Sequence, residues 1–519
     1  MARRRRRVTV EQLEPRCLLS ADGVAFPNVI RSRPADVPSA SVVGFSPAQM
    51  RAAYGFDQVT LTDLHGNSVA ATGTGQTIAI IDAYSDPNIA AEAAAFSRQF
   101  GLPQFNASGG PTLKVMSQAG STVYLPLPDA DWSVEIALDV EWAHAIAPGA
   151  NILLVEANTN SFSDLLLALN KAKVQPGVSV VSISWGGDEF PGETVWDSAF
   201  IPRRTSPYQT FVVDSGDDGS PPEWPGTSPF VVTVGGTSLQ LTSNAYASET
   251  GWSGSTGGVA AFEAEPLFQW RVQNTGLRSN PDVAYDGDPD TGVAVYLAAS
   301  YGDPAGWAEI AGTSAGAPQW AALFAIANQG RALKGLPPLA GAQAALYNLP
   351  AADFHDVTTG NNGGYSAGPG YDGVTGLGSP RANLVISHLI SGVLAGAGAP
   401  VSSNTGIVRP HFAISAGAAR LVPAAIVAET ADIAATAIEV SQRATTVYDS
   451  EVQASVLEEQ RPIPPTRALA QSVEASNYLG AASALDSVNE SDETTHRDRS
   501  PRLIDDELLD AILLNHDLR

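Results

Sequence analysis

The segment Ala311–Pro318 reads AGTSAGAP and is followed by a long apolar run at residues 319–330, QWAALFAIANQG. Gly312 allows the backbone to turn sharply, so we expect Ser314 at the start of the following helix and Gly330 at its end. A serine in that position is a candidate nucleophile. Because a serine hydroxyl is inert at its ordinary pKa, the chain must also supply a base, an orienting group and an oxyanion donor. A glycine-rich turn with an ordinary serine is the alternative for this segment taken alone.

Outward from this segment, strand-like apolar runs alternate with helical patterns. The strand-like runs lie at residues 77–81, 151–157, 178–184, 210–214 and 230–236. Continuous runs rich in Val and Ile are typical of strands that are buried on both faces. Their alternation with amphipathic helices indicates a mostly parallel sheet with helices on both sides. The predicted fold class is therefore α/β.

Two carboxylates lie in the segment 131–151, DWSVEIALDVEWAHAIAPGAN, which predicts a helix capped by Asp131. Glu135 and Asp139 are four residues apart and therefore share one face of that helix. Such a pair often lies on a solvated surface, and this alternative stays open for the pair taken alone. Because the flanking residues are apolar, we expect a buried helix whose two carboxyl groups share a proton and titrate together. A general base with an orienting partner needs that arrangement.

A third acidic position lies in the segment 212–222, VVDSGDDGSPP, where a strand ends and the chain turns on Gly216 and Gly219. This is the carboxyl edge of a strand, where open α/β sheets place their functional sites. Asp217 has two possible roles there. It can form the turn through a local hydrogen bond. Alternatively it is a protonated acid that donates a hydrogen bond to a developing oxyanion, a contribution of about 3 to 4 kcal/mol in acyl transfer.

These segments, together with SISWGG at residues 182–187, resemble the sedolisins, the serine-carboxyl peptidases, over about residues 46–391. The resemblance implies a subtilisin-like fold in which a glutamate replaces the histidine base. It also implies a role for each candidate: Ser314 as nucleophile, Glu135 as general base, Asp139 as its partner and Asp217 as oxyanion donor, with Asp82 and Trp185 in positions that support the glutamate.

A true subtilisin also carries GTSxxxP, but it needs a histidine in an HGTH-like setting. His144 is the only histidine between Asp82 and Ser314, and it lies in AHAIAP. It is five residues beyond Asp139 and off its face, so we expect a structural role for it. The chain departs from the family pattern at Asp214, where a small or apolar residue is usual. We expect this extra carboxylate to alter the pH profile.

A candidate metal site follows the serine at residues 354–380, FHDVTTGNNGGYSAGPGYDGVTGLGSP. Hard oxygen ligands on a turning backbone suit calcium, although a plain surface loop is the alternative without context. The segment also resembles the calcium loop of the sedolisins. That resemblance implies one calcium ion held by the side chains of Asp356 and Asp372 and by the backbone carbonyls of Val357, Gly368 and Gly370.

The chain divides into four parts on composition. We expect a basic export-type motif at residues 1–20, a linker at 21–45, the peptidase domain at 46–397, and an Ala- and acid-rich, disordered or weakly helical tail at 398–519. Arg3–Arg7 could be a nucleic-acid arm, a membrane tether or the start of an export signal. Residues 13–19, LEPRCLL, resemble the LEPR-x-LL motif of exported bacterial proteins, which implies export or surface display.

Family members usually carry a long N-terminal prodomain, whereas the catalytic-type sequence here begins soon after the linker. We therefore expect folding and activation to differ from theirs.

Composition narrows the function classes. The chain has 29 basic and 54 acidic residues, a net charge of −25, which argues against nucleic acid as a partner. Its one cysteine, Cys17, excludes an intramolecular disulfide and a thiolate metal site. No uninterrupted apolar run reaches the roughly 18 to 20 residues of a membrane-spanning helix, and we expect the nearest case, Leu384–Val401, to be the last helix of the domain.

Taken together, the sequence predicts an exported, calcium-dependent, monomeric serine-type endopeptidase that cleaves proteins or peptides through an acyl-enzyme. An acidic pH optimum follows because a carboxylate base must be ionised while the oxyanion aspartate stays protonated. The alternative is a catalytically silent surface protein that uses the peptidase fold for binding or adhesion.

Overall fold

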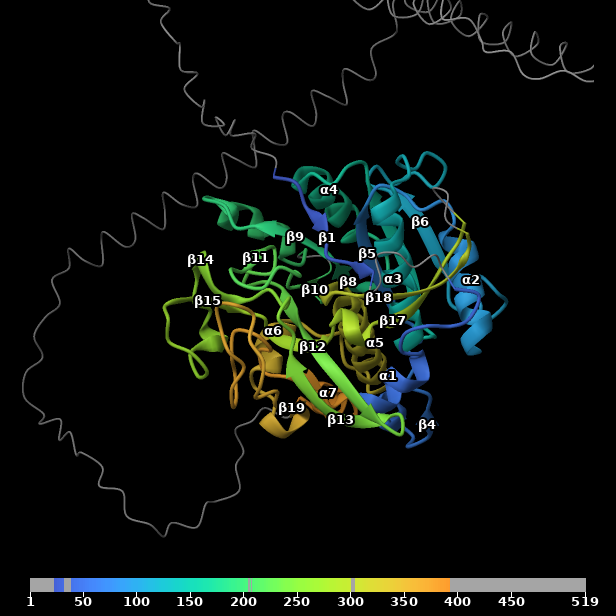
Figure 1. Cartoon of the computed structure of the whole chain (residues 1–519). Coiled ribbons are helices and arrows are strands. Elements are labelled where there is room, and N and C mark those ends of the chain that lie inside the picture. The colour runs from blue at the N-terminus through green and yellow to red at the C-terminus, as the bar shows by residue number, and fades with distance from the viewer. Residues whose placement is uncertain (1–22, 32–38, 204–205, 207, 300–303, 393–519) are drawn as a thin grey trace, which may run out of the picture. The chain divides into compact units, whose positions relative to one another are not determined.

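The structure is a computed structural model that describes residues 23–31, 39–203, 206, 208–299 and 304–392 (Figure 1). The predicted export motif at 1–20 and the predicted tail at 398–519 lie outside these residues. Among the described residues, no helix combines the length and the apolar character needed to cross a membrane.

The central sheet has eight strands, in the order β13, β12, β10, β8, β5, β7, β6, with β16 paired to β12. All neighbouring pairs are parallel except β12 with β13. The strands are β5 (Thr77–Ala83), β6 (Leu113–Ser117), β7 (Asn151–Ala157), β8 (Val178–Ile183), β10 (Thr210–Asp214), β12 (Val232–Thr242), β13 (Ala245–Gly251) and β16 (Val283–Asp286). The predicted α/β class is confirmed.

Alternate residues of each central strand face two different cores. In β5, Ile78 and Ile80 pack with helices α3 (Ala130–Ile146) and α5 (Gly316–Leu333). Ala79 and Ile81 pack with α4 (Phe162–Ala172) on the opposite face. Both faces are therefore dry, which is why these strands appear in the sequence as continuous apolar runs.

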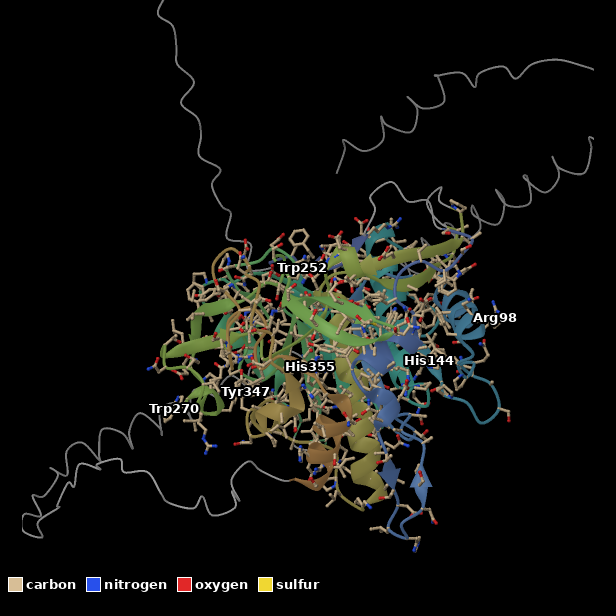
Figure 2. The ribbon with its side chains drawn as sticks, turned by 60° about the horizontal axis from the view of Figure 1, so that its bottom comes forward. Arg98, His144, Trp252, Trp270, Tyr347 and His355 are labelled. Atoms are coloured by element: carbon tan, nitrogen blue, oxygen red, sulfur yellow. The ribbon has the colours of Figure 1, made fainter. Side chains whose placement is uncertain are left out.

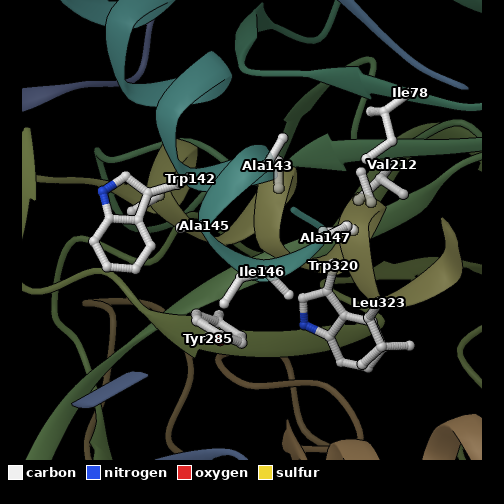
Figure 3. Packing of buried hydrophobic residues seen from close by; sticks show 14 of the residues in the cluster. Ile78, Trp142, Ala143, Ala145, Ile146, Ala147, Val212, Tyr285, Trp320 and Leu323 are labelled. Atoms are coloured by element: carbon white, nitrogen blue, oxygen red, sulfur yellow. The ribbon is translucent and has the colours of Figure 1, made fainter. Parts of the chain in front are cut away.

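Helix α3 is buried on nearly all sides, as expected for a helix that is apolar around its whole circumference. Figure 3 shows its last turn, including Ala143 and Ile146, packed among side chains of the sheet and of α5. Its N-cap is Asp129, whose carboxylate accepts the backbone N–H groups of Asp131 and Trp132 at 3.1 and 3.2 Å. The prediction that Asp131 caps the helix is therefore wrong by two residues.

Helix α5 continues past its predicted end at Gly330 and stops at Leu333. Gly330 lies inside the helix, where an added Cβ would collide with Ile390 of helix α7 (Ala382–Ser391). The glycine therefore permits the close approach of two helices and does not end one. Helix α7 is the last described helix, but it ends at Ser391, earlier than the predicted stretch.

The remaining elements surround this framework. The helices are α1 (Pro47–Ala53), α2 (Ile89–Phe100) and α6 (Ala342–Leu346), and the short 3-10 helices are η1 (Phe56–Gln58), η2 (Glu193–Phe200), η3 (Leu267–Gln269), η4 (Pro289–Thr291), η5 (Thr313–Ala315) and η6 (Ala351–Asp353). The outer strands are β1 (Phe26–Pro27), β2 (Ile30–Arg31), β3 (Leu61–Thr62), β4 (Ser68–Val69), β9 (Trp185–Asp188), β11 (Glu223–Trp224), β14 (Gly258–Ala264), β15 (Leu277–Asn280), β17 (Val293–Leu297), β18 (Gly306–Ala311), β19 (Phe354–His355) and β20 (Ser379–Pro380).

Part of the predicted linker is structured. Strand β1 pairs antiparallel with β9, with Phe26 opposite Gly186. Strand β2 pairs antiparallel with β18, with Ile30 opposite Ala311. These strands are too short to produce a recognisable alternation in the sequence, which is why the sequence indicated only a linker there.

Candidate active site

The pattern of the parallel strands brings polar side chains together at their carboxyl ends. Asp82 follows Ile78 and Ile80 on the same face of β5, and Asp214 follows Val212 on the same face of β10. Both carboxyl groups therefore point toward the face that α3 and α5 cover, and both are buried. Open α/β sheets place their sites at this edge.

Helix α3 contributes the predicted carboxylate pair, Glu135 and Asp139, and neither side chain is exposed to solvent. Asp139 accepts a hydrogen bond of 2.8 Å from the hydroxyl of Ser184, which directly follows β8. Burial raises the pKa of both carboxyl groups well above the ordinary range, and the charge of Asp139 raises the pKa of Glu135 further. Two acids held this closely in a dry site retain a proton between them.

Ser314 lies in η5, directly before α5, and its side chain is fully buried. Gly312 has a φ of 109°, which allows the turn that places the serine there. The Ser314 hydroxyl lies close enough to Glu135 to lower the pKa of that carboxyl group. The geometry between the two groups does not meet that of a formed hydrogen bond. Catalytic hydrogen bonds are commonly long before substrate binds.

Asp217 is fixed against the turn that carries the serine. One carboxylate oxygen accepts the backbone N–H of Thr313 at 2.7 Å and its hydroxyl at 2.9 Å. The other oxygen, Oδ2, has no partner among the described residues and would lie 2.5 Å from a Cβ added to Gly312. Burial raises the pKa of Asp217 well above its ordinary value. The carboxyl group can therefore keep a proton and donate it in a hydrogen bond.

Asp214 connects the site to the N-terminal segment. Its Oδ2 accepts a hydrogen bond of 2.6 Å from the side-chain amide of Asn28 and lies 3.2 Å from the hydroxyl oxygen of Thr313, whose one proton can go either to Asp214 or to Asp217. Burial raises the pKa of Asp214 to about 7, although both contacts lower it. The sequence did not indicate Asn28, because its segment has no local pattern. Thr313 stands inside the serine motif and could have been found there.

The two supporting positions lie next to each other. Burial and the charges of Glu156 and Asp214 raise the pKa of Asp82 to about 8. The indole N–H of Trp185 donates to the carbonyl of Ile81 at 2.8 Å. Trp185 therefore holds the end of β5 in place beside Asp82. Trp185 can influence Glu135 only indirectly, by positioning that strand.

Glu156 was missed in the sequence analysis. It is buried at the end of β7, where it accepts a hydrogen bond of 3.0 Å from the hydroxyl of Ser85. Burial raises its pKa to about 7. Its position directly opposite Asp82 in the paired strands could have indicated it.

Three of the four histidines in the described residues have side-chain partners away from Ser314. A ring nitrogen of His144 lies 2.8 Å from the carbonyl oxygen of Pro103, and burial lowers the pKa of His144 to about 4. His355 stacks on Tyr246, and His388 pairs with Asp353 at 2.6 Å. Figure 2 shows His144 on the side of the domain that carries Arg98, with His355 elsewhere. These positions favour the structural role expected for His144.

The five predicted calcium ligands lie in one loop. The backbone N–H of Gly370 donates to Asp356 at 3.0 Å, and that of Gly368 donates to Asp372 at 3.0 Å, so the segment 368–370 joins the two carboxylates. Residues 354–380 contain no Lys or Arg. No cluster of three or more His, Cys, Asp or Glu suited to a metal occurs in the described residues. Two carboxylates plus backbone carbonyls are nevertheless a hard-oxygen set of the kind that calcium accepts.

A cavity of about 770 Å³ lies next to the site, between the N-terminal segment, β9 and the loop that follows β9. Aromatic rings of Phe162, Phe190 and Trp196 form part of its wall. Its carboxylates come from Asp188, Glu189, Asp218 and Glu223. The cavity is thus partly apolar and carries only acidic charge.

Comparison with known proteins agrees with this geometry. The subtilase family description matches residues 133–348. Kumamolisin from Bacillus sp. (strain MN-32) is 33% identical over 397 residues, which cover 68% of this chain and 65% of kumamolisin. Sedolisin from Pseudomonas sp. (strain 101) is 27% identical over 361 residues, which cover 63% of this chain and 60% of sedolisin. The chain therefore spans less than two thirds of the length of these relatives.

A solved structure of Pseudomonas sedolisin, described as a serine-carboxyl proteinase complexed with two molecules of pseudo-iodotyrostatin, superposes with a TM-score of 0.55 at 26% identity. The alignment covers 68% of this chain and 99% of that structure. The domain thus has a subtilisin-like α/β fold. Within that fold the chain is similar to the sedolisins, as its motifs predicted.

Proposed function

We propose that this protein is a serine-carboxyl endopeptidase that hydrolyses peptide bonds in proteins or peptides. The observation that carries the proposal is the placement of Ser314 beside the buried carboxyl pair Glu135 and Asp139, with the unpartnered oxygen of Asp217 facing the turn before the serine. The homology to sedolisins supports the same assignment.

The proposed reaction starts when Glu135 accepts the proton of Ser314 Oγ as that oxygen attacks the substrate carbonyl carbon. Asp139, held by Ser184, stabilises the proton on the pair. The protonated Asp217 donates a hydrogen bond to the oxygen that becomes negative. Glu135 then gives the proton to the leaving amine, which leaves an acyl group on Ser314. Water attacks this ester with Glu135 again as base and releases the second product.

An acidic optimum follows from the charges around the serine. Asp214, with a pKa of about 7, and Asp82, with a pKa of about 8, are neutral in acid. As the pH rises through these values, Asp214 gains negative charge near Asp217, and Asp82 gains it within the same buried group of carboxyls. That charge opposes the transition state, so activity should decline toward neutral pH.

We also propose that one calcium ion binds Asp356 and Asp372 together with the carbonyls of Val357, Gly368 and Gly370. A bound calcium ion would stabilise this loop, and it takes no part in the chemical steps above. The motif at residues 13–19 supports export or surface display, and we propose that the protein acts as a monomer at that location.

A covalent serine-directed reagent tests the proposal against the alternative of a silent binding module. We expect stoichiometric labelling of Ser314 at acidic pH, and loss of labelling in Glu135→Gln, because the hydroxyl is activated only by its base. Equal, slow labelling of the parent and of Glu135→Gln would favour the binding module. Ser391→Ala, in an exposed helix end, is the control that should label like the parent.

A further inference from the structure

The hydroxyl of Thr313, directly before the proposed nucleophile, lies between two carboxyl groups. Its oxygen is 2.9 Å from Oδ1 of Asp217, 3.2 Å from Oδ2 of Asp214 and 3.0 Å from the carbonyl oxygen of Gly216. The same oxygen accepts the backbone N–H of Gly216 at 3.0 Å. Because a hydroxyl group has one proton to donate, the three acceptors compete for it.

The two carboxyl oxygens of Asp217 differ in their surroundings. Oδ1 accepts the backbone N–H of Thr313 at 2.7 Å, whereas Oδ2 has no partner among the described residues and faces the turn at Gly312. When the Thr313 hydroxyl also donates to Oδ1, that oxygen accepts two hydrogen bonds, as the carbonyl oxygen of a neutral carboxyl group does. The proton of Asp217 is then on Oδ2, where it can be donated to the oxygen of a reacting carbonyl.

Asp214 competes with Asp217 for the proton of the Thr313 hydroxyl. Its Oδ2 accepts the side-chain amide of Asn28 at 2.6 Å, and its buried Oδ1 has no partner in the part of the chain that the structure describes. A neutral Asp214 can therefore hold its own proton on Oδ1 and is a weak acceptor for Thr313. An ionised carboxylate is a much stronger acceptor than a neutral carboxyl group, so ionisation of Asp214 draws the hydroxyl proton away from Asp217.

Asp214 changes its charge within the pH range that matters for the proposed reaction. Burial raises its pKa to about 7, against the hydrogen-bonding contacts with Asn28 and Thr313, which lower it. The groups whose pKa values its charge raises are the carboxyl groups around the site: Asp82, Glu135, Asp139, Asp217 and Glu223. Asp214 is thus neutral in acid and ionises toward neutral pH.

We propose that Asp214 is a positioning residue that determines, through the Thr313 hydroxyl, which oxygen of Asp217 carries the proton. With Asp214 neutral, Thr313 donates to Asp217 Oδ1, and the proton on Oδ2 points toward the reacting carbonyl. When Asp214 releases its proton to solvent, the Thr313 hydroxyl turns to Asp214 and presents a lone pair to Asp217. Asp217 then keeps its proton on Oδ1, and Oδ2 can no longer donate to the oxyanion. The inference rests on the proposed function for the role of Asp217 as the oxyanion donor.

This control belongs to this chain in particular. Asp214 occurs where the resemblance to sedolisins leads us to expect a small or apolar residue, and such a residue cannot attract the proton of Thr313. A direct effect of the Asp214 charge on the oxyanion does not require the Thr313 hydroxyl. Variants at position 313 therefore separate the two explanations.

The kinetic test measures kcat and KM for an internally quenched peptide at pH 5 and pH 8. Because one oxyanion donor contributes about 10² to 10³ in kcat, we expect the fall in kcat between these pH values to be at least about tenfold smaller in Asp214→Asn than in the parent, with KM unchanged. Thr313→Ser keeps the hydroxyl and should keep the fall of the parent. In a Thr313→Val background, Asp214→Asn should change the fall by less than about twofold.

Two kinetic results would overturn the inference. One is a fall in Asp214→Asn as large as in the parent. The other is an effect of Asp214→Asn that persists undiminished in Thr313→Val, which would show that the charge acts directly. The matched control is Asp218→Asn, because Asp218 is exposed and its charge also raises the pKa of Asp217. This variant should keep the pH dependence of kcat seen in the parent.

Infrared spectroscopy in a Ser314→Ala background tests the position of the proton without catalysis. The carbonyl stretch of protonated Asp217 is identified by its loss in Asp217→Asn. We expect its frequency to rise from pH 5 to pH 8, because the carbonyl oxygen changes from Oδ1, which accepts two hydrogen bonds, to the unpartnered Oδ2. The frequency should not change in Asp214→Asn or in Thr313→Val. A constant frequency in the parent, or loss of the band at pH 8, overturns the inference, whereas the expected shift in a chain without peptidase activity would contradict only the proposed function.

Discussion

Replacing Asp82 by asparagine should flatten the pH dependence of stability. The folded-state pKa of Asp82 is about 8, whereas an unfolded aspartate titrates near 4. Between these values the folded chain holds a proton that the unfolded chain releases, so the stability contribution is present below about pH 4 and is lost as the pH rises toward 8. One such proton corresponds to a slope of about 1.4 kcal/mol per pH unit.

The neighbouring acids reduce the expected difference. Glu156 and Asp214 raise the pKa of Asp82, and Asp82 in turn raises those of Glu135 and Asp139, so part of the effect is shared. We therefore expect Asp82→Asn to make the slope shallower by about 1 kcal/mol per pH unit. In absolute terms the parent should lose stability between pH 4 and pH 8 faster than the variant.

The assay is urea unfolding, followed by tryptophan fluorescence at each pH unit from 4 to 8, in a Ser314→Ala background with calcium held constant. Asp63→Asn is the control, because Asp63 is only partly buried and its pKa is lowered by hydrogen bonds from Asn67. This variant should leave the slope between pH 5 and pH 8 unchanged. Identical slopes for Asp82→Asn and the parent would refute the account of the buried carboxyl cluster.

Three further predictions concern the supports of the site. Trp185→Phe should lower the free energy of unfolding in urea by about 1 to 3 kcal/mol, because the buried carbonyl of Ile81 loses its hydrogen-bond donor. The control Trp270→Phe, at an exposed position, should change the free energy of unfolding little. Equal losses for the two variants would contradict this prediction. Chelation of calcium should lower the melting temperature of the parent. Asp372→Asn should have this lower melting temperature even with calcium present, and chelation should not lower it further. A melting temperature of Asp372→Asn that falls on chelation as much as that of the parent would argue against the proposed ligand set. Gly312→Ala should reduce peptidase activity at least 100-fold, because the new Cβ would collide with Asn28 and Asp217. Gly335→Ala, which has open space around it, should keep its activity. A Gly312→Ala variant with full activity would contradict the proposed role of this turn in the site.

Much of the framework could be predicted because burial on both faces leaves a strong pattern. Strands β7 and β10 have the predicted bounds, since each is a continuous buried run. Strand β12 begins two residues later than predicted and extends to Thr242, because its outer half pairs with β13 and carries polar residues such as Gln240. Gly330 was misassigned because sequence alone cannot distinguish a helix end from a close contact between helices.

The site could be predicted in part for a similar reason. Ser314, Glu135 and Asp217 stand in recognisable motifs, and the structure places them around one turn. Asn28 lies nearly two hundred positions from its partner Asp214, in a segment without a pattern, so only the fold could reveal the contact.

The most direct test of the central claim is hydrolysis of a denatured protein substrate from pH 3 to pH 8 in the presence of calcium. The parent chain is compared with Ser314→Ala and Glu135→Gln. The account predicts activity in the acidic range that falls toward neutral pH and that either catalytic substitution reduces by at least about 10³-fold. Activity that survives Glu135→Gln, or a folded and calcium-loaded parent chain that is inactive at every pH, would contradict it.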